Sequence, residues 1–386
     1  MGGPSVHGQE TQKSGSTRRV RILGTRGIPG GHGGFESFAQ DVSLYLVARG
    51  WDVTVYCQHE GATHIHEDRW RGVRLVHFFV KGNGSLSTMW FDWLCTRHAL
   101  GECGVALVLG YNTAMFSAFY RLRSIRSIMN MDGLEWKRKK YGLAARAWFY
   151  LNEWLGCWLS TDLVADHPAI AEHLATRGVT GKTRTIAYGS RAITVADERI
   201  LAEMGIVPGQ QYVLLIARPE PENSILEIVR AFSKSVRGVK LVVLGRYGRD
   251  VQYQRAVLDA ASIEVLFLGA IYDQRVVDSL RFFSTLYVHG HTVGGTNPAL
   301  VEAMGAGAAV LAHDNRFNRW VAGPGAAYFS AEDDCARRFD ELLGTAGVSL
   351  LPDMRRWSSQ RHHEAFQLDD RLAEYEQLLA TERAVT

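Results

Sequence analysis

The chain has 386 residues, 46% of them hydrophobic, and its 43 basic and 40 acidic residues give a formal net charge of +3. This length exceeds what one hydrophobic core usually holds, so the sequence predicts two domains. The small charge excess argues against a nucleic-acid partner, and the five widely spaced cysteines form no C-x-x-C pair for zinc or dithiol chemistry. We therefore expect reduced cysteines and no metal.

Residues 1–18 are polar and rich in glycine and serine, without the apolar run of a signal peptide, so we expect a disordered tail. No later stretch reaches about 18 uninterrupted apolar residues. The sequence predicts a cytoplasmic protein, and any membrane contact is expected to be peripheral, on the inner face of the cell membrane.

From residue 19 onward, short β-branched runs alternate with amphipathic stretches, which is typical of a doubly wound parallel sheet. A first domain over residues 19–190 is predicted, with strands at 20–23, 51–57, 73–78, 105–109, 125–130, 163–165 and 183–187. A second domain over residues 191–360 is predicted, with strands at 212–217, 241–244, 263–268, 286–289 and 309–312. The fold class is α/β: two Rossmann-like domains that face each other across a cleft.

A polar helix is expected over residues 355–383, with apolar residues near helical spacing. Residues 361–386, which include most of this helix, form a separate C-terminal element in this interpretation. We expect it to pack back on the first domain.

The first strand leads into a loop with six glycines between residues 24 and 34, just before a helix. Backbone amides in such a loop can approach a phosphate or a sugar closely. The glycine spacing is not G-x-G-x-x-G, and no acidic residue ends the second strand, so we expect neither a nicotinamide nor another cofactor. A merely flexible turn is the alternative. The polar residues favour a functional loop, and the candidates here are Arg26, His32, Gly33, Gly34 and Glu36.

In the second domain, residues 289–305 lead from a strand end through a Gly-Gly bend into a helix. Pro298 suits the first helical position and Asn297 suits the cap. Amides at this helix start form an anion site for a diphosphate, and Glu302 can reach a ribose hydroxyl. The candidate residues for binding such a nucleoside diphosphate group, here called donor-binding residues, are His291, Gly295, Thr296, Asn297 and Glu302.

Arg218 follows the first strand of the second domain. Its permanently charged guanidinium can stabilise negative charge on a leaving diphosphate, which makes it a candidate catalytic and donor-binding residue. An ordinary salt bridge with Glu220 or Glu222 is the alternative. Further donor-binding candidates near strand ends of this domain are Asn223, Gly245, Ile271 and Tyr272.

Asp132 and His167 follow strands of the first domain and are acceptor-side candidates, together with Arg26 and Glu36. Asp132 could orient the acceptor or support developing positive charge, so it is also a catalytic candidate. His167 starts a helix and can equally be structural. The basic and aromatic residues from Trp136 to Trp158 suit either an anionic bilayer or a solvated charge cluster before a buried helix.

Six segments carry a resemblance to a known family: 24–29, 33–36, 130–138, 165–170, 217–223 and 289–298. On them the chain resembles the family 4 glycosyltransferases of the GT-B superfamily, and within these the bacterial polysaccharide rhamnosyltransferases. The resemblance implies metal-independent, retaining transfer, with diphosphate contacts from Arg218 and the turn at 295–297 and a ribose held by Glu302.

Two positions depart from the wider superfamily: Gly294 stands where a glutamate is usual, and Asn223 where a lysine is usual. Gly294 leaves the sugar contacts to the backbone and His291, and Asn223 leaves one positive charge fewer on the diphosphate. Both departures fit the rhamnosyl subgroup. The resemblance therefore implies transfer of L-rhamnose from dTDP-rhamnose to a glycan or lipid-linked glycan acceptor in surface polysaccharide biosynthesis. The alternatives are a UDP- or GDP-sugar donor, or a non-catalytic sugar-nucleotide-binding protein.

Overall fold

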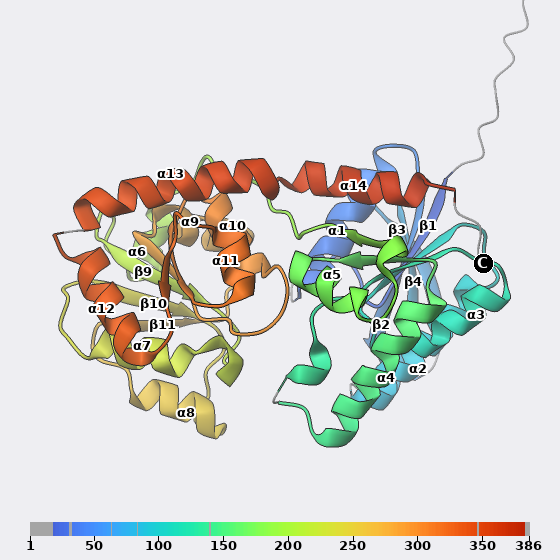
Figure 1. The fold of residues 1–386 in the computed structure, drawn as a ribbon, viewed down its shortest axis with the longest axis horizontal. Coiled ribbons are helices and arrows are strands. Elements are labelled where there is room, and N and C mark those ends of the chain that lie inside the picture. Colours follow the sequence, from blue (N-terminus) through green and yellow to red (C-terminus); the bar gives the residue numbers. More distant parts are fainter. Residues whose placement is uncertain are drawn as a thin grey trace, which may run out of the picture.

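The computed structural model describes residues 18–30, 33–62, 64–82, 84–138, 140–345 and 347–382. Two α/β domains lie side by side, and two C-terminal helices run across both of them (Figure 1). All but the last residue of the predicted tail, and also His32, lie outside the described residues.

The first domain contains an eight-stranded sheet in the order β3-β4-β2-β1-β5-β6-β7-β8. Neighbouring strands are parallel except for β3 and β4. The strands are β1 Arg19–Leu23, β2 Asp52–Glu60, β3 Ile65–Trp70, β4 Val73–Val80, β5 Val105–Leu109, β6 Ser127–Asn130, β7 Asp162–Ala165 and β8 Thr183–Thr185.

β3 was not predicted from the sequence. Its residues are mostly polar and exposed, so no hydrophobic alternation marks the strand. It folds back on β4 as an antiparallel edge, with Ile65 opposite Phe78.

Helices cover both faces of this sheet (Figure 1). They are α1 Gly34–Val47, α2 Ser85–Ala99, η1 Ala114–Phe116, α3 Ser117–Leu122, η2 Glu135–Lys137, α4 Leu143–Leu159, α5 Pro168–Ala175 and η3 Thr180–Lys182.

The second domain contains a six-stranded parallel sheet in the order β11-β10-β9-β12-β13-β14. Its strands are β9 Tyr212–Ile216, β10 Lys240–Leu244, β11 Val265–Gly269, β12 Leu286–His289, β13 Ala309–His313 and β14 Ala327–Phe329. Its helices are α6 Arg199–Glu203, η4 Pro221–Asn223, α7 Ile225–Ser233, α8 Gln252–Asp259, α9 Gln274–Phe283, α10 Pro298–Gly305, α11 Arg316–Ala322 and α12 Glu332–Leu343. The predicted α/β fold class, with two Rossmann-like domains, is confirmed.

The C-terminal stretch forms two helices, α13 Gly347–Ala365 and α14 Leu368–Ala380, instead of one. The break lies at Phe366 and Gln367, where the chain pairs with Ser190: the Ser190 amide donates to the Phe366 carbonyl at 2.9 Å. α14 then packs on the first domain, where the Tyr375 ring lies 4.7 Å from that of Phe38. The Arg126 side chain donates to carbonyls at the end of α14 and to Asp162, which fastens the helix to the sheet.

Candidate active site

The glycine-rich loop between β1 and α1 runs directly over the ends of neighbouring strands. Gly24 has a φ of 80°, and a Cβ atom there would lie 2.1 Å from the Leu109 carbonyl oxygen. Gly27 has a φ of 115°, and its Cβ atom would lie 2.6 Å from Sγ of Cys57. Both positions therefore require glycine, and they hold the loop at the carboxyl edge of the sheet.

Glu36, in the first turn of α1, turns back and braces this loop. Its Oε1 accepts a hydrogen bond from the Arg26 amide at 3.1 Å and one from the Thr25 hydroxyl at 3.4 Å. Its Oε2 lies 2.0 Å from where a Cβ atom on Gly33 would stand. Glu36 thus shapes the loop, whereas the side chain of Arg26 is exposed.

A cavity of about 200 Å³ lies beside Glu36, where β1, β2 and β5 end and α2 and η1 form a wall. The Asp92 carboxylate lines it and accepts a hydrogen bond from the Thr113 hydroxyl at 2.8 Å. Burial raises the pKa of Asp92 to about 7, so that this group can donate or accept a hydrogen bond near neutral pH. Gln58 also lines the cavity, and its amide oxygen is buried without a partner among the described residues. Neither residue was singled out from the sequence.

Two glycines of the first domain lie against the donor loop of the second domain, residues 290–297. A Cβ atom on Gly34 would stand 3.5 Å from Cγ of Pro298, and one on Gly133 would stand 3.2 Å from Cα of Gly294. The two predicted halves of the site therefore meet at one junction. At Gly133 a side chain would press on the main chain of Gly294, whereas at Gly34 a Cβ atom would make an ordinary contact.

An ion pair crosses this junction. Arg138 of the first domain contacts Glu135 at 2.8 Å and Glu222 of the second domain at 3.2 Å. Burial, with the neighbouring charge of Asp132, raises the pKa of Glu135, while Arg138 opposes the shift. Glu135 is thus part of a buried charge network.

Asp132 lies at the end of β6 in a left-handed conformation, with a φ of 48°. This conformation is uncommon for a residue other than glycine and costs about 1 kcal/mol or more. Its amide donates to Oδ1 of Asn130 at 2.9 Å, and the Asn130 amide group donates to the Tyr375 hydroxyl at 2.9 Å. The docked helix α14 therefore supports the conformation of Asp132.

Asp166 follows β7 and reaches the donor loop, although its neighbour His167 was the candidate predicted from the sequence. It accepts a hydrogen bond from the Thr296 amide at 3.0 Å, and its own carbonyl accepts one from the Thr296 hydroxyl. Its Oδ1 is buried without a partner among the described residues, at the position where a Cβ atom on Gly295 would stand. Burial and then the charge of Asp132 raise the pKa of Asp166 to about 8, so that its carboxyl is mainly protonated at neutral pH.

His167 caps α5 and lies in the contact between the domains. Its Nδ1 accepts a hydrogen bond from the Ala169 amide at 3.0 Å, and its Nε2 lies 3.3 Å from the Phe317 carbonyl oxygen. Burial lowers its pKa to about 4. The ring is therefore neutral, and both of its nitrogens are engaged in structural contacts.

The donor loop enters α10 as predicted: Asn297 is the N-cap, accepts a hydrogen bond from the Ala299 amide at 3.0 Å, and precedes Pro298 in the first turn. The Thr292 amide and hydroxyl both donate to the Glu222 carbonyl at 2.9 Å, which ties this loop to the turn after β9. Within the part of the chain that the structure describes, the amides of Gly295 and Asn297 donate no hydrogen bond. They are available to an anion.

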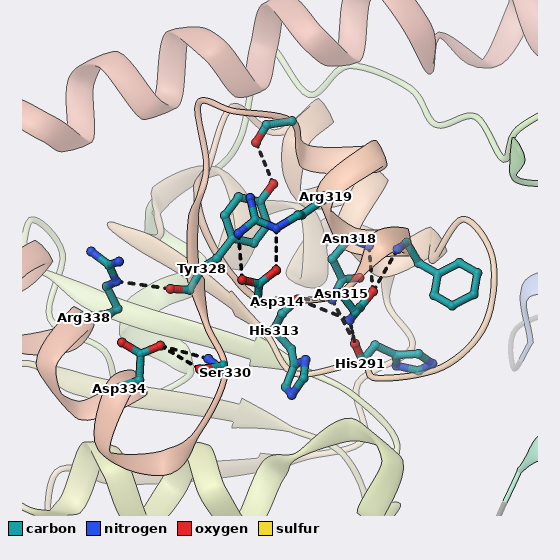
Figure 2. A network of polar contacts seen from close by, with 12 residues as sticks. His291, His313, Asp314, Asn315, Asn318, Arg319, Tyr328, Ser330, Asp334 and Arg338 are labelled. Atoms are coloured by element: carbon teal, nitrogen blue, oxygen red, sulfur yellow. Dashed lines mark hydrogen bonds and ion pairs between the residues drawn. The ribbon is translucent and has the colours of Figure 1, made fainter. Parts of the chain in front are cut away.

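His291 is held in the donor loop through its main chain. Its carbonyl accepts hydrogen bonds from the side-chain amides of Asn315 and Asn318, both at 2.9 Å (Figure 2). Burial, and then the positive charge of Arg138, Arg218 and Lys140, lowers the pKa of His291 to about 4. The ring is therefore a neutral hydrogen-bonding group.

Arg218 is exposed at the end of β9 and has no ion-pair partner among the described residues. Glu222, one of the two partners considered above, pairs with Arg138 instead. The Asn223 side chain donates to the Arg218 carbonyl at 2.8 Å and so fixes the turn. The guanidinium is left available to a ligand.

The remaining candidates lie around the same sheet. Glu302 is ion-paired with Arg281 and accepts a hydrogen bond from the Tyr188 hydroxyl at 3.2 Å. Gly245 has a φ of 148°, and a Cβ atom there would lie 2.8 Å from the Ala217 carbonyl oxygen. Beyond β11, Ile271 packs at the core whereas Tyr272 is exposed.

The described residues include neither a cluster of metal ligands nor a membrane-spanning helix. They contain no group of three or more histidine, cysteine or acidic side chains that could hold a metal ion. None of their helices has the length and apolar character needed to cross a bilayer.

Two family models match the chain, one in each domain. Residues 17–191 match a domain of unknown function (DUF1972), and residues 197–348 match the glycosyl transferases group 1. No curated protein sequence gives a significant match.

Similar solved structures cover both domains. Sucrose-phosphate synthase from Thermosynechococcus elongatus has a TM-score of 0.75 at 14% identity, over 94% of this chain and 98% of that one. HepE from Anabaena, in complex with UDP-glucose, has a TM-score of 0.73 at 13% identity, over 94% and 99%. A UDP-forming trehalose-phosphate synthase from Burkholderia vietnamiensis has a TM-score of 0.71 at 11% identity, over 94% and 99%.

These structures have the GT-B arrangement of two Rossmann-like domains, and at such low identity they establish the fold alone. The glycosyl transferases group 1 match covers the domain that holds Arg218 and the donor loop. The chain therefore carries a glycosyl transferases group 1 domain within a GT-B fold, and both findings support a glycosyltransferase.

Proposed function

We propose that this chain is a retaining transferase that moves L-rhamnose from dTDP-rhamnose to a lipid-linked glycan. It would act at the inner face of the cell membrane, in the synthesis of a bacterial surface polysaccharide. Two observations carry the proposal. Arg218 has no ion-pair partner among the described residues, and the Gly295 and Asn297 amides of the donor loop donate no hydrogen bond there. The turn after β9 and the donor loop are tied together by hydrogen bonds to the Glu222 carbonyl. A diphosphate is well matched to a guanidinium and a helix N-terminus.

In this proposal, the sugar leaves its diphosphate through an oxocarbenium-like state. The bond between the anomeric carbon and the diphosphate oxygen breaks while a bond to the acceptor oxygen forms. Arg218 and the loop amides stabilise the negative charge of the departing diphosphate, which takes up the acceptor proton. Asp132 would orient the acceptor hydroxyl or support the positive charge on the sugar ring.

The acceptor would enter from the first domain. The cavity beside Glu36 is about the size of one sugar ring, and Asp92 and Gln58 offer oxygen acceptors to sugar hydroxyls. Arg26, whose side chain is exposed on the same loop, would contact the rest of the glycan.

Rhamnose is supported by the resemblance described above and by Gly294. Its φ of 113° is one that side-chain-bearing residues rarely adopt, so no carboxylate projects from this position to bind a sugar hydroxyl. The neutral His291 ring and the main chain would hold the sugar instead. A 6-deoxy sugar has one hydroxyl fewer to satisfy, which suits this sparser set of contacts.

A second candidate keeps the reaction and changes the donor to a UDP-sugar. It is favoured by the structural neighbours whose names include UDP or UDP-glucose, HepE and the UDP-forming synthase. In either case the exposed Tyr272 and neighbouring Ile271 would cover the nucleobase, and Glu302 would bind the ribose.

Thermal unfolding with dTDP, UDP, GDP and NAD tests the proposal. A ligand at about a hundredfold excess over its Kd adds about 2.7 kcal/mol to the free energy of unfolding. Selective stabilisation by dTDP that disappears in Arg218→Ala supports the rhamnosyl proposal. Stabilisation by UDP or GDP instead would indicate a different donor nucleotide and therefore a different sugar. Stabilisation by NAD alone would contradict a transferase site.

A further inference from the structure

The first domain exposes many large apolar side chains on α2, η1, α3 and α4. Half of all exposed large hydrophobic side chains in the described part of the chain lie within residues 85–160. Trp90 and Trp158 are 50% and 59% exposed, although tryptophan is usually well buried. We call this surface the apolar face, and its main members are Leu86, Trp90, Phe119, Leu143, Leu151 and Trp158.

The elements of the apolar face are joined by direct contacts. The ring of Trp93 lies 5.5 Å from that of Phe116 and 5.0 Å from that of Phe119, which connects α2 to η1 and α3. Arg121 of α3 donates a hydrogen bond to the Trp158 carbonyl of α4 at 2.9 Å. α2 and α4 lie on the side of the first domain away from α14 (Figure 1). The elements that carry the exposed side chains are therefore neighbours in the first domain.

Charge is distributed unevenly over the same stretch. Within residues 84–138 and 140–160, every exposed charged side chain is basic: Arg97, Arg121, Arg123, Lys137 and Lys140. The acidic side chains there are buried or half-buried, such as Glu153, which is ion-paired with Arg177. An apolar surface whose exposed charges are all positive is complementary to a surface that has both negative charge and hydrocarbon chains.

We infer that the apolar face binds an anionic lipid bilayer. Tryptophan and leucine side chains enter the interfacial region, while the arginines and lysines contact lipid phosphates. The inference rests on the proposed function, because an enzyme with a lipid-linked acceptor has to bind that acceptor at a membrane. The cavity that we assign to the acceptor shares Phe91, Asp92 and Phe116 with α2 and η1, so the sugar can enter it while the lipid stays in the bilayer.

Sedimentation with vesicles tests the inference on the full chain. We expect binding to vesicles of phosphatidylcholine mixed with phosphatidylglycerol, weaker binding at high salt, and little binding to phosphatidylcholine alone. Trp90→Ser combined with Trp158→Ser should lower the partition coefficient at least about tenfold. Lys137→Gln and Arg123→Gln should lower it about fivefold each.

The matched control is Val236→Ser combined with Ile263→Ser. These residues are 90% and 91% exposed, and both lie in the second domain. Circular dichroism and melting temperature should show that all variants are folded. Absence of wild-type binding to the anionic vesicles, or an equal loss in the control, would overturn the inference.

A second copy of the chain is the competing occupant of this face. If the wild-type chain self-associates but does not bind vesicles, and the tryptophan variants do not self-associate, the apolar face is a dimer interface. That result would overturn the inference. The result is separable from the proposed function, because stabilisation by dTDP does not involve the apolar face. If dTDP fails to stabilise the chain but the chain still binds vesicles, the proposed donor is rejected and the inference that the apolar face binds a bilayer stands.

Discussion

The donor loop of the second domain and the acidic residues of the first domain meet at one junction, but they are stabilised in opposite ways. The donor loop is held by neutral hydrogen bonds: its Thr292 binds the Glu222 carbonyl, and its His291 carbonyl is bound by two asparagines. In the first domain, Asp132 adopts a left-handed φ and Asp166 has a buried oxygen without a described partner. The donor side is thus preorganised to bind, whereas the groups that titrate near neutral pH belong to the first domain.

Removing the charge of the donor side should have the largest effect. Arg218→Ala should lower kcat about a hundredfold, or about 3 kcal/mol, because this charge is most useful when the diphosphate departs. Arg218→Lys should recover part of the rate, and Arg199→Ala, at an exposed arginine paired with Asp197, should change nothing. Full activity in Arg218→Ala would show that the donor site lies elsewhere.

Asp166 should make the first domain pH-sensitive. Its pKa is raised from 3.8 to about 8, so the folded chain holds a proton that the unfolded chain releases. The free energy of unfolding should therefore fall as pH rises through this range, by at least about 1.4 kcal/mol more than in Asp166→Asn. Denaturant unfolding between pH 4 and pH 8, the interval set by these two pKa values, measures the difference. Identical slopes for the two proteins would mean that Asp166 is ionised in the folded state.

The support of Asp132 by α14 should be visible in a pair of tyrosine variants. Tyr375→Phe removes the hydroxyl that binds Asn130 and should cost about 1 kcal/mol of stability together with a few-fold loss in kcat. Tyr212→Phe removes a comparable hydrogen bond, to the Leu280 carbonyl in the second domain. It should cost similar stability with no loss in kcat. An equal loss of kcat in both variants would remove the link between α14 and Asp132.

His167 should give the smallest effect. Asparagine is also a good helix cap, so His167→Asn should keep kcat within about twofold, whereas His167→Ala should lose about 1 kcal/mol more stability than His167→Asn. A large loss of kcat in a stable His167→Asn protein would restore the acceptor-side role suggested by the sequence. Steady-state rates and melting curves of the two variants decide between these roles.

Most of the fold could be predicted because strands that are buried on both faces have continuous apolar sequences, as in β5 and β9. The start of α10 could be predicted because Asn297 and Pro298 act locally. β3 could not, since an exposed polar strand forms only by pairing with β4. The break between α13 and α14 could not, because it depends on Ser190, far away in the sequence.

The site was predictable to a similar extent. Arg218 and the donor loop follow strands, and topology alone brings strand ends to one edge of a sheet. Asp166 and Asp92 could not be recognised, because their raised pKa values come from burial that only the packed structure creates. For Asp166, the partner is Thr296 of the other domain. Burial and contacts between the two domains leave no local pattern in the sequence.

The most direct test of the transferase is the movement of labelled sugar. The chain is incubated with dTDP-rhamnose labelled in the sugar and with bacterial membranes that contain lipid-linked glycans, and the label is followed into the lipid extract. We predict incorporation with release of dTDP, lost in Arg218→Ala and retained in Arg199→Ala. If dTDP binds but no dTDP-, UDP- or GDP-linked sugar reaches any lipid or glycan, the chain binds sugar nucleotides without transferring them, and the account is wrong.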